Sequence, residues 1–189
     1  MSVSDRERWE RKYAAGNPNP SFTPDPILTQ HVALLTGDGL ALDVACGVGQ
    51  NALYLAKQGY EVIAVDGSLT ALRHCRAQLR RRPLPVHLVA ADLDQFKLPA
   101  AHFALILVVR FLDRALIPRL KNALVPGGLL IYETFNIHWL QAKPSFNPAF
   151  LLEPGELAAQ FADFELIATN DNPQMHDALS HFVGRRPRV

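Results

Sequence analysis

Unbroken apolar runs alternate with amphipathic stretches through the middle of this chain. The apolar runs predict five strands, at residues 40–44, 61–65, 86–90, 103–109 and 129–133. The amphipathic stretches between them predict helices at 51–58, 69–82 and 114–124. Strands that are apolar throughout are typical of a parallel sheet covered by helices on both faces. The sequence therefore predicts a doubly wound α/β fold.

The two ends of the chain extend this pattern. Helices are predicted at 4–13, 27–35 and 154–162. Strands are predicted at 164–169 and 179–185, and no helical pattern separates them, so we expect an antiparallel pair at the sheet edge. The result is a mostly parallel, seven-stranded, Rossmann-like sheet in one domain spanning 1–189, with residues 1–36 as an N-terminal helical flap.

Composition narrows the class of protein. The 19 Lys and Arg nearly balance the 18 Asp and Glu, so no global field favours nucleic acid. Two cysteines, Cys46 and Cys75, make no disulfide framework and no zinc-ligand spacing, which predicts no metal and a cytoplasmic location. The longest clean apolar run, 103–109, is too short to cross a membrane. We expect a small-molecule partner; the sequence makes no prediction about oligomeric state.

The turn after the first strand carries the main chemical signal. Gly47 and Gly49 would let the backbone approach a ligand, and the next helix would point its amides at the same place. Asp66 ends the second strand, where a carboxylate can accept hydrogen bonds from ribose hydroxyls. Asp92 follows the third strand and is placed for the exocyclic amine of a base.

The same turn also fits a dinucleotide. Gly47-x-Gly49-x-x-Ala52 matches that fingerprint, and Asp66 lies 17 positions after Gly49. Asp43 argues for a different ligand, because a carboxylate before the glycines would repel a pyrophosphate and would suit an ammonium group. A methyl donor is favoured over NAD. An NAD-dependent oxidoreductase and a non-catalytic binder of the methyl donor remain the alternatives.

Several tracts resemble the class I S-adenosylmethionine-dependent methyltransferases, and more narrowly the branch that includes the tellurite-resistance methyltransferases. They are residues 41–56, 59–68, 110–114, 126–134 and 147–157. Ala45 departs from the family pattern, since many members have a glycine there, and Ala104 stands where an Asp is common. The resemblance implies S-adenosylmethionine as cofactor and methyl transfer as the activity.

It also implies which residues would contact that cofactor. The methionine part would be surrounded by the turn after the first strand, the ribose held by Asp66, and the adenine lined by residues after the second and third strands. With Trp9 and Tyr13, which could close as a flap or only pack as a helix stripe, the predicted cofactor-binding residues are Trp9, Tyr13, Asp43, Ala45, Gly47, Gly49, Asn51, Asp66, Gly67, Ser68, Asp92, Leu93 and Val109.

The acceptor side is predicted from the segment 135–153. It is rich in Asn, Pro and aromatic residues and follows the fifth strand, where a substrate lid would belong. Arg110 is the predicted substrate contact, with a surface pair to Asp113 as the alternative. His138 is a candidate base, although a loop histidine is commonly just solvated. No other base stands at the strand tips, which favours a soft or anionic acceptor such as a thiol, tellurite or selenite.

Overall fold

The structure is a computed structural model that describes residues 3–16, 20–171 and 177–188. Residues 17–19, within the predicted Gly-Pro break, and 172–176, within the predicted last connection, lie outside the described residues. The chain divides into two compact units, Met1–Lys97 and Leu98–Val189.

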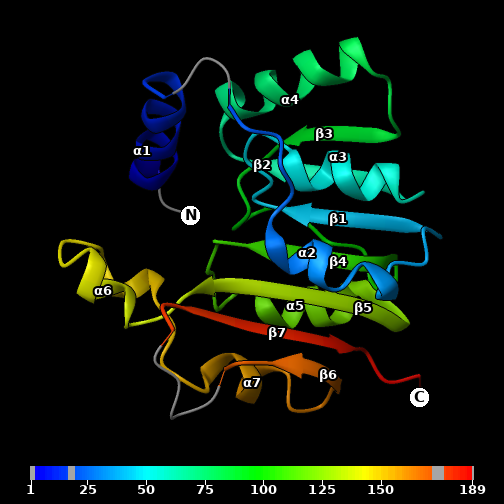
Figure 1. Ribbon diagram of the computed structural model, residues 1–189, viewed down its shortest axis with the longest axis vertical. Coiled ribbons are helices and arrows are strands. Elements are labelled where there is room, and N and C mark those ends of the chain that lie inside the picture. The colour runs from blue at the N-terminus through cyan, green and yellow to red at the C-terminus, as the bar shows by residue number, and fades with distance from the viewer. Residues whose placement is uncertain (1–2, 17–19, 172–176, 189) are drawn as a thin grey trace. The chain divides into compact units, whose positions relative to one another are not determined.

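Unit 1 holds three parallel strands and most of the helices (Figure 1). Strand β2 pairs in parallel with both β1 and β3, and Asp43 lies opposite Ala64. Helix α3 packs across these strands. The elements of unit 1 are α1 (Val3–Ala14), α2 (Pro26–Gln30), η1 (Val32–Leu34), β1 (Leu40–Val44), α3 (Gln50–Lys57), β2 (Glu61–Asp66), α4 (Leu69–Arg81) and β3 (Val86–Ala90).

Unit 2 holds the other four strands. β4 is parallel to β5, β5 is antiparallel to β7, and β7 is antiparallel to β6. The predicted antiparallel terminal pair is confirmed. The elements of unit 2 are β4 (Phe103–Val109), α5 (Ile117–Ala123), β5 (Leu124–Phe135), α6 (Trp139–Ala142), η2 (Pro148–Phe150), α7 (Glu156–Gln160), β6 (Glu165–Thr169) and β7 (Leu179–Arg185).

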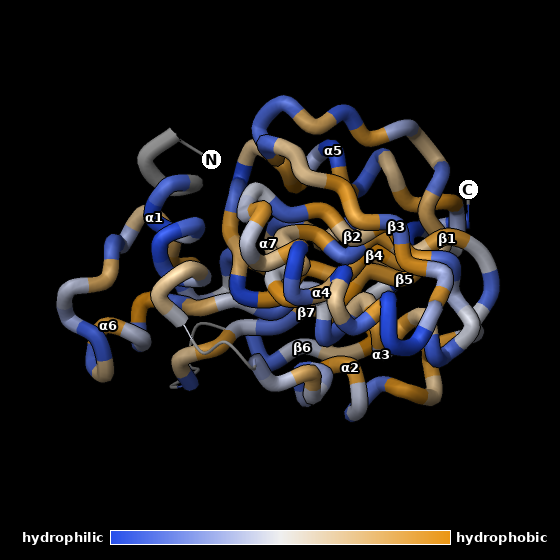
Figure 2. The backbone as a smooth tube through the Cα atoms, turned by 90° about the horizontal axis from the view of Figure 1, so that it is seen from above, coloured by the Kyte–Doolittle hydropathy of each residue, from blue (hydrophilic) through white to orange (hydrophobic). Residues whose placement is uncertain are grey.

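The strand order is β3-β2-β1-β4-β5-β7-β6 in one seven-stranded sheet. The order reverses after β1, which is the pattern of a doubly wound sheet, and the predicted fold class is confirmed. The central strands carry much of the apolar character of the chain, as the orange tube around β1, β4 and β5 in Figure 2 shows. Their side chains form the core of each unit, from Leu42 and Val62 in unit 1 to Leu105 and Ile131 in unit 2, all at most 1% exposed.

Two predicted helices are shorter than expected. The helix predicted at 27–35 is divided into α2 and η1 at His31, whose Nδ1 bonds the Ile27 carbonyl oxygen that a continuing helix would use. The helix predicted at 114–124 begins only at Ile117. Asp113 caps a turn before it instead, accepting from the Ala115 N–H at 2.9 Å.

Two further boundaries differ near the C-terminus. The predicted turn at 126–128 is part of β5, because the Gly127 N–H donates to the Arg186 carbonyl and the Arg186 N–H to the Gly128 carbonyl, which continues pairing beyond β7. The helix predicted at 154–162 spans only Glu156–Gln160. Among the described residues, no helix combines the length and apolar character needed to cross a membrane.

Candidate functional site

The turn between β1 and α3 has an unusual backbone. Ala45, Gly47 and Gly49 all have left-handed φ angles, of 55°, 55° and 82°. A Cβ on Gly47 would lie 2.6 Å from the Tyr13 hydroxyl oxygen, and one on Gly49 would lie 2.3 Å from Cys75 Sγ. The packing of unit 1 therefore requires Gly49, and Gly47 lies close to the end of the Tyr13 side chain, features that the sequence analysis did not predict.

Asp43 is the buried carboxyl group of this turn. It is 1% exposed, and its Oδ2 has no hydrogen-bond partner in the part of the chain that the structure describes. Burial is the largest of the effects that together raise the pKa of Asp43 to about 8; a hydrogen bond from the Ala52 N–H opposes it, and the negative charges of Asp66 and Asp25 add to it. The carboxyl group is therefore mostly protonated near pH 7.

Asp66 joins the glycine turn to the start of α4. Its Oδ2 accepts from the Gly47 N–H at 2.8 Å, and its Oδ1 accepts from the Ser68 N–H at 2.7 Å. The carboxylate is 7% exposed, and burial raises its pKa. Each oxygen of a carboxylate can accept two hydrogen bonds, so both retain capacity for the hydroxyls of a ribose.

Asp25 is a buried member of this region that the sequence analysis missed. Its N–H donates to Asn51 Oδ1 at 2.9 Å, while its Oδ2 accepts from Asn51 Nδ2 at 3.0 Å and Gln50 Nε2 at 3.1 Å. Asn51, which is also a predicted cofactor contact, holds the segment before α2 against α3. Standing before Pro26, Asp25 has the sequence signature of a helix cap, yet its side chain caps no helix.

Helix α1 is attached to α4 through Glu10. Its carboxylate accepts from Ser68 Oγ and Thr70 Oγ1, both at 2.5 Å, and from the Thr70 N–H at 3.3 Å. The hydrogen bond from Ser68, followed by that from Thr70, lowers the pKa of Glu10. A carboxylate at the first turn of a helix is also favoured by the helix dipole. Ser68 is the N-cap of α4 and accepts from the Ala71 N–H at 3.1 Å; the sequence analysis missed Glu10.

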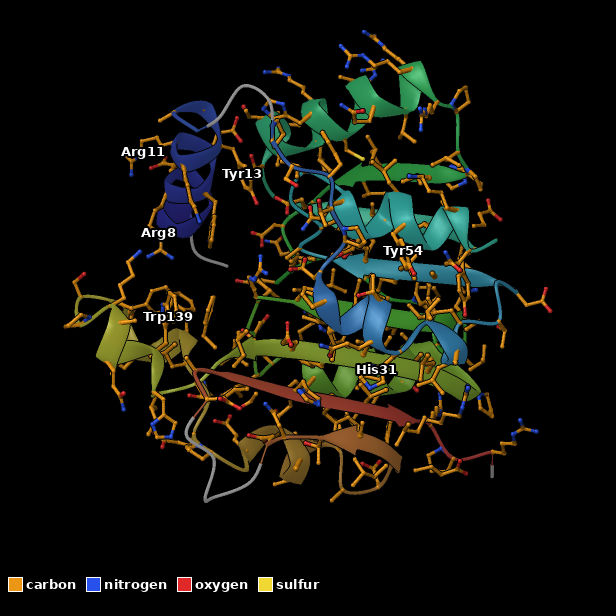
Figure 3. The ribbon with its side chains drawn as sticks, in the orientation of Figure 1. Arg8, Arg11, Tyr13, His31, Tyr54 and Trp139 are labelled. Carbon is orange, nitrogen blue, oxygen red and sulfur yellow. The ribbon has the colours of Figure 1, made fainter. Side chains whose placement is uncertain are left out.

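The two predicted flap residues have different surroundings. Tyr13 points from α1 toward the loops of unit 1 (Figure 3), and its hydroxyl is the group that approaches Gly47. The Trp9 ring lies 6.1 Å from that of Tyr13, with Lys12 Nζ 4.1 Å from its centroid. The Tyr13 hydroxyl is therefore placed at the glycine turn.

The residues predicted for the adenine lie after β2 and β3. Gly67 and Asp92 are half-buried, and Leu93 is 1% exposed. Asp92 Oδ1 accepts from the Asp94 N–H at 3.1 Å, which holds the turn after β3. In unit 1 the structure thus brings Tyr13 and Gly47 to the same ends of β1, β2 and β3 as Gly67, Asp92 and Leu93.

Cys46 and Cys75 are buried, and burial raises the pKa of both thiols, that of Cys75 to about 12. Small-residue packing, the predicted role of Cys46, fits this environment. Among the described residues, no group of three or more His, Cys, Asp or Glu side chains is placed to hold a metal ion.

In unit 2, Arg110 follows the last residue of β4, Val109. Arg110 is exposed and has a φ of 56°, and its N–H donates to the Glu133 carbonyl oxygen at 2.8 Å. A left-handed conformation is costly for a residue with a side chain and occurs often at functional sites. The backbone therefore aims this arginine away from the path of β4.

The predicted lid, 135–153, is a loop whose two ends are paired. The Leu152 N–H donates to the Phe135 carbonyl, and the Ile137 N–H donates to the Leu152 carbonyl, both at 3.0 Å. Asn136, fully buried, donates to the Asp177 carbonyl and Ser180 Oγ and accepts from the His138 N–H. The half-buried His138 immediately precedes α6.

Arg114 secures the second half of the lid. Its guanidinium donates to both carboxylate oxygens of Glu156, at 2.6 and 2.8 Å, and to the carbonyls of Ala149 and Leu151, at 3.1 and 2.9 Å. The fork of an arginine suits such a set of acceptors, and a lysine could not reproduce it. The sequence offered no signal for this role, because the partners lie 35 to 42 positions away.

Aromatic side chains gather inside the lid. The Phe135 and Trp139 rings are stacked with centroids 4.5 Å apart, and Phe146 lies 6.2 Å from Phe135. All three residues are only half-buried, unlike the rings of the core. The Trp139 Nε1 atom is buried and has no hydrogen-bond partner in the described residues.

Residues 41–128 match the model of a methyltransferase domain. The fold is that of the class I methyltransferases. The chain is 34% identical over 122 residues to an uncharacterized methyltransferase of Mycobacterium bovis, covering 62% of this chain and 60% of that one. The N-methyltransferase NodS from Bradyrhizobium japonicum, solved with S-adenosyl-l-homocysteine, is similar with a TM-score of 0.70 and 18% identity, over 96% of this chain and 98% of that one.

The structure of TehB from Haemophilus influenzae is similar with a TM-score of 0.71 and 18% identity, over 84% of this chain and 61% of that one. The chain spans about half the length of the curated relatives it matches, with 44%, 51% and 60% of the first three covered. These likenesses agree with the fold that the strand order establishes and with the methyltransferase domain at 41–128.

Proposed function

We propose that this class I methyltransferase domain binds S-adenosylmethionine and transfers its methyl group to a small-molecule acceptor. The observation that carries the proposal is the Asp43 carboxyl group, buried, with one oxygen unpartnered, beside a glycine turn. A buried carboxyl in this state is complementary to a cation, and the methionine part of the cofactor carries an ammonium. A pyrophosphate at the same place would be repelled, which argues against NAD.

The other residues of unit 1 fit the remainder of that cofactor. Asp66 would hold the ribose hydroxyls through the free lone pairs of its two oxygens, and Asp92 with Leu93 would meet the adenine. Gly67 and Ser68 would line the adenine from the turn after β2, and Ala45 would face the methionine part. Residues 1–36 would form the flap, with Tyr13 rather than Trp9 at its contact with the glycine turn.

When bound, the cofactor supplies a sulfonium that is a good leaving group. The protein's residues need to hold the acceptor in line with the methyl carbon and exclude water, and positioning of this kind can remove roughly 7–11 kcal/mol of barrier. Arg110 would orient an anionic acceptor, since its guanidinium is charged at every working pH. His138 would accept a proton where the acceptor still carries one.

We propose a soft or already anionic acceptor, such as a thiolate or a tellurite- or selenite-like oxyanion, because such a nucleophile needs no strong base. The lid at 135–153 would cover it. Residues 1–189 would then work as one methyltransferase domain.

Calorimetric titration with S-adenosylhomocysteine, with NAD in a parallel cell, tests the cofactor. Micromolar binding that is lost in Asp66→Ala and kept in Asp38→Asn, an exposed carboxylate of the same unit, is the expected result. Heat from NAD alone would favour the oxidoreductase alternative. Binding of S-adenosylhomocysteine without turnover of any acceptor would favour a non-catalytic binder.

A further inference from the structure

We infer that the lid selects an acceptor that is a planar aromatic ring carrying an anionic thiolate or phenolate. The inference rests on the proposed function and narrows its acceptor. It depends on three observations about residues 135–152: an open stack of aromatic rings, a buried indole N–H without an acceptor, and a segment without carboxylates.

The first observation is the ring stack. Phe135 and Trp139 are stacked at 4.5 Å with an angle of 30° between planes, and Phe146 is tilted by 57° to Phe135. Rings that served only to fill a core would be buried, as Phe161 and Phe182 are at 0% and 2% exposure. The lid rings are half-buried, so part of their surface is available to another flat ring.

The second observation is the Trp139 indole. Its Nε1 is buried and donates no hydrogen bond to the described residues. A buried donor without a partner costs about 1–3 kcal/mol, and native proteins rarely keep one without a functional reason. An oxygen or sulfur anion on a stacked ring would accept from it once a small rotation of the half-buried Trp139 side chain exposes the N–H.

The third observation is charge. The segment from Phe135 to Leu152 contains Lys143 and His138 and no Asp or Glu. Lys143 Nζ lies 5.9 Å from the centroid of the Phe146 ring. Arg110 follows β4, which is parallel to β5, so it stands at the same end of these two strands as Phe135. Lys143 and Arg110 are the two cations that would favour an anion over a neutral or positive acceptor.

The lid is also fixed before any ligand binds. Its ends are paired at Asn136 and Leu152, and Arg114 holds its second half through Glu156 and two carbonyls. A preformed site loses less conformational entropy on binding than one that must be ordered. Such a site fits a rigid ring better than a small, symmetric oxyanion.

The reaction is balanced without a base. A lone pair of the thiolate or phenolate forms the new bond to the methyl carbon as the carbon–sulfonium bond breaks. The bonding pair of that broken bond stays on the cofactor sulfur, which becomes a neutral thioether. No proton moves, because the acceptor enters as the anion.

The test compares two ligands that differ mainly in aromaticity, benzoate and cyclohexanecarboxylate, both anions near pH 7. Their dissociation constants are measured on the full chain saturated with S-adenosylhomocysteine. We expect benzoate to bind at least tenfold more tightly. Trp139→Phe, which keeps a ring and deletes the N–H, and Phe146→Leu should each weaken benzoate about tenfold while S-adenosylhomocysteine titrates as before. Tyr54→Phe, a polar deletion on a half-buried ring of unit 1, should change neither.

Turnover with thiophenolate, phenolate, cyclohexanethiolate and tellurite then identifies the nucleophile. Methylation of thiophenolate or phenolate, with a lower KM than that of cyclohexanethiolate, supports the inference. It also shows whether the acceptor atom is sulfur or oxygen. Equal binding of the two carboxylates, no effect of Trp139→Phe, or turnover of tellurite alone would overturn it. If the unmodified chain does not bind S-adenosylhomocysteine at all, the proposed function itself is overturned, so the two failures are distinguishable.

Discussion

The glycine turn of unit 1 and the proposed lid of unit 2 differ in the chemistry that they offer to a ligand. The turn is surrounded by buried carboxyl groups, Asp25, Asp43 and Asp66, which are 5%, 1% and 7% exposed. The lid has half-buried rings, Lys143 and no carboxylate between Phe135 and Leu152. Buried charge suits a ligand that carries a complementary charge at one atom, whereas rings of this kind suit a flat surface.

The two regions are also held in place differently. In unit 1, carboxylates accept hydrogen bonds from backbone and side-chain donors, as Asp66 does from Gly47 and Ser68. In unit 2, the anchoring group is a cation, since Arg114 donates hydrogen bonds to Glu156 and to two carbonyl oxygens. In unit 1 both the anchoring groups and the predicted ligand-binding groups are acidic. In unit 2 both the anchoring group, Arg114, and the predicted substrate contact, Arg110, are basic.

The strongest test of this contrast is Asp43→Asn. It keeps the shape of the side chain and removes the charge, so we expect affinity for S-adenosylmethionine to fall roughly 100-fold, the value of a charge-assisted hydrogen bond of about 2.7 kcal/mol. Calorimetry measures it, with Asp38→Asn as the control. If the variant binds S-adenosylmethionine within threefold of the unmodified chain, the buried charge of Asp43 does not contribute to cofactor binding.

A second test uses pH. The pKa of Asp43 is raised from 3.8 to about 8 in the folded chain, so its contribution to stability is full below pH 4 and is lost as pH rises through 8. The melting temperature of the cofactor-free protein should therefore fall between pH 5.5 and 8.5. Asp43→Asn should flatten that dependence. An unchanged slope in the variant would assign the pH effect to another group.

Arg114→Met tests the anchoring of the lid. The change removes the bidentate bond to Glu156 and the two bonds to carbonyls, and we expect the free energy of unfolding to fall by about 2 kcal/mol. Chemical denaturation measures it. Arg76→Met, an exposed arginine on α4, should stay within about 0.5 kcal/mol of the unmodified chain. Equal effects of the two changes would contradict a specific role for Arg114.

Glu10→Gln tests the flap. Because the carboxylate accepts from Ser68 and Thr70, its replacement should loosen α1 and weaken S-adenosylhomocysteine binding three- to tenfold, or about 1 kcal/mol. Glu7→Gln changes an exposed carboxylate on the same helix and should leave binding as it is. If the two variants bind alike, α1 does not contribute to the cofactor site.

Ala45→Gly should have the smallest effect, and a stabilising one. Ala45 has a φ of 55°, and a left-handed conformation costs a residue with a Cβ about 1–2 kcal/mol, of which glycine's greater unfolded-state entropy offsets part. We expect a gain of about 0.5–1 kcal/mol in thermal unfolding. Ala101→Gly, with a φ of 46° in unit 2, should gain a similar amount and leave cofactor binding unchanged. A loss in Ala45→Gly would show that the alanine methyl group packs usefully.

Much of the fold could be predicted, and the reason differs between elements. Strands at 40–44, 86–90, 103–109 and 179–185 agree with the structure to the residue. The clearest signal is the unbroken apolar run at 103–109, which is typical of a buried strand. The helix ends at His31 and Ile117 were missed, since side-chain bonds and turns compete there with helix propensity. The start of β5 was missed because its pairing partners lie far away in the sequence, Phe103 for Leu124 and Arg186 for Gly127 and Gly128.

The sequence by itself determined the α/β order, the acidic ends of the strands and the glycine turn, because these follow from local hydrophobic pattern and backbone freedom. Only the tertiary structure decided that Asn51 serves Asp25, that Glu10 caps α4, and that Arg114 fastens the lid. It also decided that Asp43 keeps an unpartnered oxygen. These features depend on groups 26 to 60 positions apart, and no local pattern records which distant donor meets which acceptor.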